Sequence, residues 1–130
     1  MGMSNVDRFD PFEAQSALAS RVGSLVFVSG MTGLEIATDT VPSDLADQMR
    51  QAYENIGRIL AHYRTSLAST IEQTIFFVGE APAARAAYDV VCRETFGNDA
   101  PVATMVGVTM LVEPRSHVEI KVVAAIGGSS

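Results

Sequence analysis

The chain has 130 residues, of which 15 are Asp or Glu and 9 are Lys or Arg, so its formal net charge is -6. This length suits one domain with a substantial core, since 48% of the residues are hydrophobic. The acidic balance argues against nucleic acid as a partner, because affinity for phosphate backbones comes from clustered Lys and Arg.

The apolar segments, the cysteine and the histidines exclude further classes. No apolar run approaches the roughly 18 to 20 residues of a membrane-spanning helix, and the N-terminus lacks a signal-peptide core. We therefore expect a cytoplasmic protein with no membrane partner. Cys92 is the only cysteine and cannot form an internal disulfide. His62 and His117 lie far apart in the sequence, so we expect neither a metal nor a cofactor.

The N-terminal residues predict an arm followed by a hairpin. Residues 1–15 have weak hydrophobic periodicity, so we expect a partly ordered arm on the surface. Residues 17–22 and 25–29 are strand-forming runs, and the Gly23-Ser24 between them is typical of a two-residue hairpin turn. A single domain is therefore expected over residues 16–130.

Two helices are expected, with a strand between them in the sequence. Residues 44–63 carry apolar side chains at steps of three and four, and Ser43 just before them can cap the helix. Residues 71–78 are rich in β-branched and aromatic residues and predict a strand. Residues 82–96 predict the second helix, which Gly97 can end by adopting a positive φ.

The C-terminal end predicts two further strands. Residues 102–112 are apolar at both alternating positions, so both sides of this strand should be covered. Residues 118–126 alternate in polarity, with Glu119 on the polar side. Pro114 lies in the connection, and we expect the two strands to pair as an antiparallel hairpin.

The element order β-β-α-β-α-β-β predicts an α+β fold with a five-stranded sheet. Two helices are too few to cover both faces of that sheet, so one face needs another copy of the chain to bury it. Met105 and Val106 should therefore lie on opposite faces, one under the helices and one towards a neighbouring subunit. We expect an oligomer.

Several stretches of the chain also form the pattern of one protein family. They are residues 21–30 (RVGSLVFVSG), residues 51–60 with Asn55, the strand at 71–78, Phe96-Gly97 ahead of Pro101, and Val118-Glu119-Ile120. In this order they resemble the RidA/YjgF reactive-intermediate deaminase family, and the resemblance extends from about residue 15 onward. It implies a chorismate-mutase-like subunit with two helices on one face of a mixed five-stranded sheet.

The same resemblance implies an assembly and an activity. The family forms homotrimers whose sheets build a central barrel, with small-molecule clefts at the three subunit interfaces. Its best-known members hydrolyse imines and enamines such as 2-aminoacrylate to keto acids. The expected partners of this chain are therefore further copies of itself and a small-molecule ligand.

Matching the family motifs assigns residues to the cleft. Glu119 matches the glutamate that positions the attacking water, and Ala103 stands where active deaminases carry a carboxylate-binding arginine. Ser16 and Asp89 stand at the places of a family tyrosine and asparagine. The implied site comprises Glu119 as the catalytic residue and Ser16, Ser29, Gly30, Asp89, Ala103 and Thr104 as substrate-binding residues.

The alanine at position 103 leaves two functional classes open. An alanine has no hydrogen-bond donor, whereas a guanidinium binds a carboxylate through two charge-assisted contacts. Standard 2-aminoacrylate deamination is therefore not expected, unless Arg21, Arg85 or Arg115 replaces the missing charge. Glu119 could still serve an imine hydrolase, or the trimer could bind a small ligand without catalysis.

Each matched residue also has a simpler interpretation. Ser29-Gly30 can be an ordinary strand end. Glu119 can be a solvated carboxylate, paired with Lys121 or Arg115. Tyr88 and Cys92, one helical turn apart, are expected in the core, because a free cysteine behaves as a small hydrophobic residue.

Overall fold

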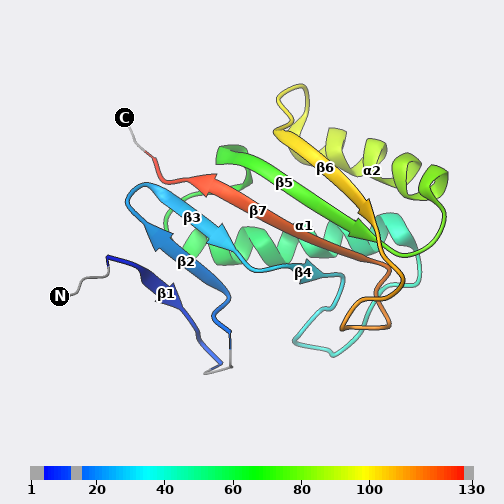
Figure 1. Cartoon of the computed structure of the whole chain (residues 1–130), viewed down its shortest axis with the longest axis horizontal. Helices are drawn as coiled ribbons and strands as arrows, with labels where there is room; N and C mark the ends of the chain where they lie inside the picture. Colours follow the sequence, from blue (N-terminus) through cyan, green and yellow to red (C-terminus); the bar gives the residue numbers. More distant parts are fainter. Residues whose placement is uncertain (1–4, 13–15, 128–130) are drawn as a thin grey trace.

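The structure is a computed structural model, and it describes residues 5–12 and 16–127. Figure 1 shows the strands side by side, with α1 crossing behind them. The elements are β1 (Asp7–Phe9), β2 (Ala19–Val22), β3 (Leu25–Val28), β4 (Met31–Thr32), α1 (Leu45–His62), the short 3-10 helix η1 (Leu67–Ser69), β5 (Thr70–Phe77), α2 (Ala81–Phe96), β6 (Val102–Gly107) and β7 (Val118–Ala125).

All of these strands belong to one sheet. Its order is β1-β2-β3-β7-β5-β6, and β4 pairs with β7 beside β3. The β5–β6 pair is parallel and the other pairs are antiparallel. The expected α+β class with a mixed sheet is therefore confirmed. The structure adds β1, which pairs with β2 inside the segment expected to be a partly ordered arm, and the two-residue β4.

The expected hairpin between the last two strands is wrong. β6 and β7 are both strands, but β5 lies between them and pairs with each. Residues 108–117 cross the end of β5 to connect them, and Met110 and Val112 in this connection are exposed. Polarity alternation identifies a strand but does not identify its partner, so the sequence could not distinguish a hairpin from this longer crossing.

The core lies between the sheet and the two helices. Val118, Ile120 and Val122 of β7 belong to one buried cluster with Ile56 of α1 and Val91 of α2. These strand residues alternate, so they share one face, and the helix residues recur at helical spacing. Both helices therefore cover the same face of the sheet.

The ends of both helices follow from local sequence. Asp44, and not the expected Ser43, caps α1, since its carboxylate accepts a hydrogen bond from the Asp47 N–H at 3.1 Å. Gly97 ends α2 with a φ of 63° and donates its N–H to the Arg93 carbonyl at 2.9 Å.

A chain of polar side chains crosses this core. The Tyr53 hydroxyl donates to Gln73 Oε1 at 2.6 Å, and Gln73 Nε2 donates to the Tyr88 hydroxyl at 3.0 Å. Cys92 Sγ lies 3.3 Å from the same hydroxyl, so the expected core position of Tyr88 and Cys92 is confirmed. Burial raises the pKa of both tyrosines, which keeps them neutral donors and acceptors.

The other face of the sheet carries apolar side chains that nothing in the described chain covers. Met105 packs against the helix-side core, whereas Val106 pairs with Phe76 on the opposite face, as expected from strand alternation. Phe27 is 45% exposed and Val102 is 70% exposed on that second face. The face without helices thus carries large apolar side chains that are open to solvent.

The helix cap provides a direct test of the fold. Replacing Asp44 with Ala should lower the free energy of unfolding by about 1 kcal/mol, because the Asp47 N–H loses its partner. Ser43→Ala should change it by no more than a few tenths, since Ser43 is exposed and is not the cap. Urea unfolding at one fixed protein concentration measures both, and equal losses would contradict the assignment of the cap.

Candidate functional site

Glu119 lies on the face of the sheet that the helices do not cover. Its neighbours Val118 and Ile120 are buried under the helices, so alternation turns Glu119 the other way. It pairs with Thr32 of β4 on one side and with Phe76 of β5 on the other. The side chain is half-buried.

The Glu119 side chain covers the backbone of Gly30. A Cβ added at Gly30 would come within 2.7 Å of the Glu119 carboxyl carbon, so the position tolerates a side chain only if Glu119 moves. Within residues 5–12 and 16–127, Glu119 forms no ion pair with Lys121 or Arg115, nor with any other cation. Its carboxylate remains able to accept hydrogen bonds from water or from a ligand.

Ser29 precedes Gly30 in the chain, and its backbone bonds to the segment that contains Ser16. The Ser29 N–H donates to the Leu18 carbonyl at 2.8 Å, which places Ser29 beside the segment that begins with Ser16. Both serine side chains are exposed. Of the residues assigned from the sequence, the structure places Gly30 against Glu119, and Ser29 directly precedes Gly30 in the chain.

The other assigned residues lie elsewhere on the chain. Ala103 pairs with Gln73 and so belongs to the helix-facing side of β6, whereas Thr104 pairs with Thr74 on the side of Glu119. Two strand spacings separate β6 from β7, or about 10 Å. Asp89 is exposed on α2 and is ion-paired with Arg85 at 2.9 Å. A single subunit does not assemble the complete set.

The three arginines that could replace the missing charge are engaged away from Glu119. Arg21 Nε donates to the Gly23 carbonyl at 3.0 Å, and Arg85 pairs with Asp89. Arg115 pairs with Glu113 at 2.8 Å and with Asp39 at 3.0 Å. The hydrogen bonds from Arg115 lower the pKa of Glu113 to about 2, so this pair stays charged at neutral pH.

A cavity of about 370 Å³ lies apart from these residues. It is on the helix side of the sheet, since Met31 lines it while the next residue, Thr32, pairs with Glu119 on the other side. Its lining includes the polar residues Glu35, Asn55 and Arg58 and the apolar residues Phe9, Pro11, Phe12, Leu18, Met31, Ile36, Ala37 and Ile59. These residues come from segments that are distant in the sequence, so no local sequence pattern predicts the cavity.

In the part of the chain that the structure describes, no three His, Cys, Asp or Glu side chains converge in a way that could hold a metal ion. No helix within the same residues is long and apolar enough to span a bilayer.

Solved structures share this arrangement of two helices on one face of a mixed sheet, which is the chorismate-mutase-like fold. A YjgF/YER057c/UK114 family member from Mycobacterium tuberculosis is 27% identical with a TM-score of 0.80, over 94% of this chain and 100% of its own. RidA from the Antarctic bacterium Psychrobacter sp. PAMC 21119 is 22% identical with a TM-score of 0.80, over 92% and 94%.

Sequence comparison identifies the family. The family described as endoribonuclease L-PSP matches residues 6–126. A RutC family protein of Haemophilus influenzae is 29% identical over 92 residues, which are 69% of this chain and 71% of that protein. The chain therefore belongs to the endoribonuclease L-PSP family, and its resemblance to RidA/YjgF proteins is confirmed.

Two glycines near the site should respond differently to the same substitution. A Cβ at Gly33 would meet Gln48 Cα at 2.9 Å, and this atom belongs to the backbone of α1. Gly33→Ala should therefore lower the free energy of unfolding by about 1 to 3 kcal/mol, as overpacking does. Gly30→Ala should cost less, because the Glu119 side chain can rotate away. Chemical unfolding of both variants checks this, and a larger loss for Gly30→Ala would show that Glu119 cannot move.

Proposed function

We propose that the protein is a homotrimer with small-molecule clefts at its subunit interfaces, where Glu119 positions water for hydrolysis of an imine-type C=N bond. The observation that carries this function is the half-buried Glu119 carboxylate, which covers Gly30 and has no cationic partner in the described chain. A carboxylate held this way can accept a proton from water.

The arrangement of one subunit supports a site shared between copies. Ser29, Gly30 and Glu119 lie close together, while Ala103 on the edge strand β6 is separated from Glu119 by β5. An interface that brings β6 of one copy to Glu119 of another would unite the two groups. It would also cover the exposed apolar face that includes Phe27 and Val102.

The proposed reaction needs one water molecule and no cofactor. The water oxygen attacks the imine carbon while Glu119 takes one of its protons. The carboxyl then returns that proton to nitrogen, which gives a carbinolamine. The carboxylate next moves the carbinolamine hydroxyl proton to nitrogen, the C–N bond breaks with loss of ammonia, and the carbon keeps the oxygen as a carbonyl. Ser29 and Thr104 hydroxyls and the N–H groups near Gly30 would supply neutral hydrogen bonds to the substrate.

Ala103 sets the kind of substrate. Without an arginine at this position the cleft lacks the two charge-assisted bonds that hold a carboxylate. Arg21, Arg85 and Arg115 are all engaged elsewhere within the chain. We therefore propose an imine that does not depend on a carboxylate for binding, and poor turnover of 2-aminoacrylate.

A trimer that binds a small ligand without catalysis is the second candidate. It is favoured by the same loss of the arginine, because a cleft can keep its shape when it loses its substrate anchor. Ribonuclease action, which the family description names, is not proposed, since a chain with a net charge of -6 offers no basic groove for a phosphate backbone. The cytoplasmic location stays a prediction.

The assembly can be tested by mass. Native mass spectrometry at micromolar concentration should give about 41 kDa, three times the 13.8 kDa subunit. Val102→Lys should weaken the assembly, because Val102 lies on the uncovered face and an interface there would have to bury the new charge. The register partner Glu72 could pair with this lysine, but desolvation of the pair would still cost free energy. Val90→Lys, on the exposed side of α2, is the matched control. A wild-type mass of one subunit would rule out the trimer.

The chemistry can be tested by restoring the arginine. Ala103→Arg should raise the rate of 2-aminoacrylate hydrolysis by about one to two decades, since a charge-assisted hydrogen bond contributes roughly 1.5 to 3 kcal/mol. A coupled assay, in which a dehydratase generates the imine and keto acid is measured, follows the reaction. Adding Glu119→Ala to Ala103→Arg should abolish the gain.

Three outcomes separate the candidates. A wild type as fast as an arginine-bearing relative would mean that another cation replaces the arginine. A double variant that keeps the gain would make Glu119 a structural carboxylate. No turnover by either protein, together with retained trimer mass, would favour the binding role.

A further inference from the structure

The cavity between β1, β4 and α1 has the size and walls of a small-molecule site. Its volume of about 370 Å³ falls within the range of roughly 300 to 1,000 Å³ that such sites occupy. It lies on the helix side of the sheet, opposite to Glu119, and all its described walls belong to one chain. It is therefore separate from the interface cleft proposed above.

The apolar wall of this cavity is held in place before any ligand arrives. Phe9 stacks on His62 of α1 with 4.0 Å between ring centroids, and it contacts Tyr63 edge-on at 6.3 Å. Ile59 is buried in the core behind the cavity. A wall fixed in this way reduces the ordering cost of binding.

Two large apolar side chains of the lining remain exposed. Phe12 is 60% exposed and Ile36 is 55% exposed, and they come from two separate segments of the chain. Exposed apolar groups around a concave site are what an apolar ligand would cover.

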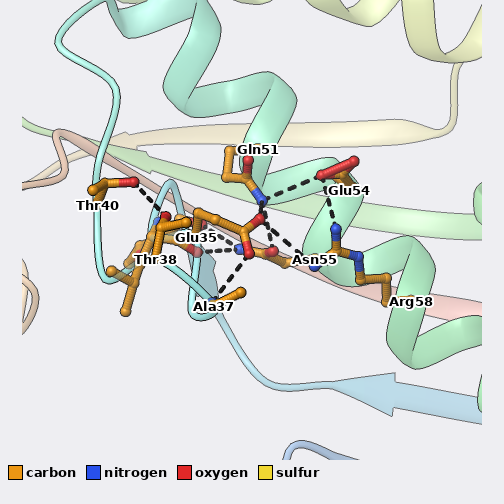
Figure 2. Close-up of polar contacts among 10 residues, drawn as sticks. Glu35, Ala37, Thr38, Thr40, Gln51, Glu54, Asn55 and Arg58 are labelled. Carbon is orange, nitrogen blue, oxygen red and sulfur yellow. Dashed lines mark hydrogen bonds and ion pairs between the residues drawn. The ribbon is translucent and has the colours of Figure 1, made fainter.

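The polar end of the cavity is formed by the cluster shown in Figure 2. Asn55 has no free donor for a ligand, because Nδ2 donates to the carbonyls of Thr32 at 3.1 Å and Leu34 at 2.8 Å. Its Oδ1 accepts from Gln51 Nε2 at 2.9 Å. Asn55 therefore fixes the structure, and a ligand must be recognised by Glu35 or Arg58.

Glu35 keeps the capacity to bind a donor. Its Oε1 accepts from the Ala37 N–H at 3.1 Å and its Oε2 accepts from Gln51 at 3.0 Å. Each carboxylate oxygen can accept two hydrogen bonds, so Oε1 retains one lone pair, whereas Oε2 also faces Arg58 Nη1 at 3.6 Å. The side chain is only 20% exposed, so an interaction there is less screened than one at the surface.

The charge of this cluster favours a cation. Arg58 lies 3.6 Å from Glu35 and 3.3 Å from Glu54, so two carboxylates share one guanidinium and leave one net negative charge. This negative charge would repel a carboxylate ligand, whereas an ammonium group would neutralise it.

We propose that this cavity binds a small amphipathic amine, whose aromatic or branched aliphatic body packs on Phe9, Ile36 and Ile59 and whose ammonium group donates to Glu35. This binding site is independent of the proposed hydrolase activity.

A pair of probes with the same body and opposite charge tests the ligand class. 2-Phenylethylamine should bind the full-length protein, with ¹H–¹⁵N shift changes at Ile36, Ala37 and Ile59. 3-Phenylpropionate should bind at least about tenfold more weakly by calorimetry, as expected when one charge-assisted contact is lost. Equal binding of the two probes, or no binding of the amine, would overturn the proposal.

Matched variants test the residues. Glu35→Gln should weaken amine binding about tenfold and remove the preference for the amine, while Glu72→Gln, an exposed acid on β5, should change neither. Ile36→Ala should weaken both probes, and Val90→Ala on α2 should not. Unchanged unfolding curves for all four variants keep a loss of binding distinct from a loss of fold.

The position of the shifts separates this site from the cleft. Shift changes centred on Gly30 and Glu119 would place the amine in the cleft and would overturn the cavity site, leaving the proposed hydrolysis untouched. Binding at the cavity in a protein that fails every imine assay would support the amine site alone.

Discussion

The pairing of β7 with its neighbours is the constraint on which the rest of the structure depends. β3 and β4 pair along one edge of β7, and β5 pairs along the other. This double ladder fixes the register in which Val118 and Ile120 enter the core and Glu119 faces away from it. A slip of one residue would expose the core residues and bury the carboxylate. The core and the position of Glu119 therefore depend on the same strand register.

The long loop between β4 and α1 depends on buried polar contacts. Ser116 Oγ accepts from the Gly33 N–H at 3.1 Å, and Gln48 Oε1 accepts from the His117 N–H at 2.8 Å. Gln48 Nε2 also donates to the Pro42 carbonyl at 2.8 Å. Both ends of the loop are therefore tied to α1 or to the start of β7. Because the loop supplies Glu35 and Ile36 to the cavity, these contacts also shape that cavity.

The helices and most strands could be predicted because hydrophobic periodicity is a local property of the chain. The partners of the strands could not, because β5 separates β6 from β7 and only the assembled sheet shows it. The helix cap was missed by one residue, since Ser43 and Asp44 are both suitable cap residues and only geometry selects Asp44.

The candidate site divides in the same way. The family pattern located Gly30 and Glu119, which the structure places in contact, but it could not show that Ala103 belongs to the other face of the sheet. The cavity escaped prediction entirely, because Phe9, Glu35 and Ile59 come from three separate segments and each has an ordinary local sequence.

The two residues of β4 join these two regions. Met31 contributes to the cavity, Thr32 lies beside Glu119, and the Asn55 amide of α1 holds the Thr32 carbonyl. The backbone of β4 thus separates the cavity from the surroundings of Glu119 by the thickness of one strand. Neither region can be remodelled alone, because a backbone displacement that enlarges one intrudes on the other. A substitution at Asn55, which does not touch Glu119, would still be transmitted to the carboxylate through the backbone of Thr32.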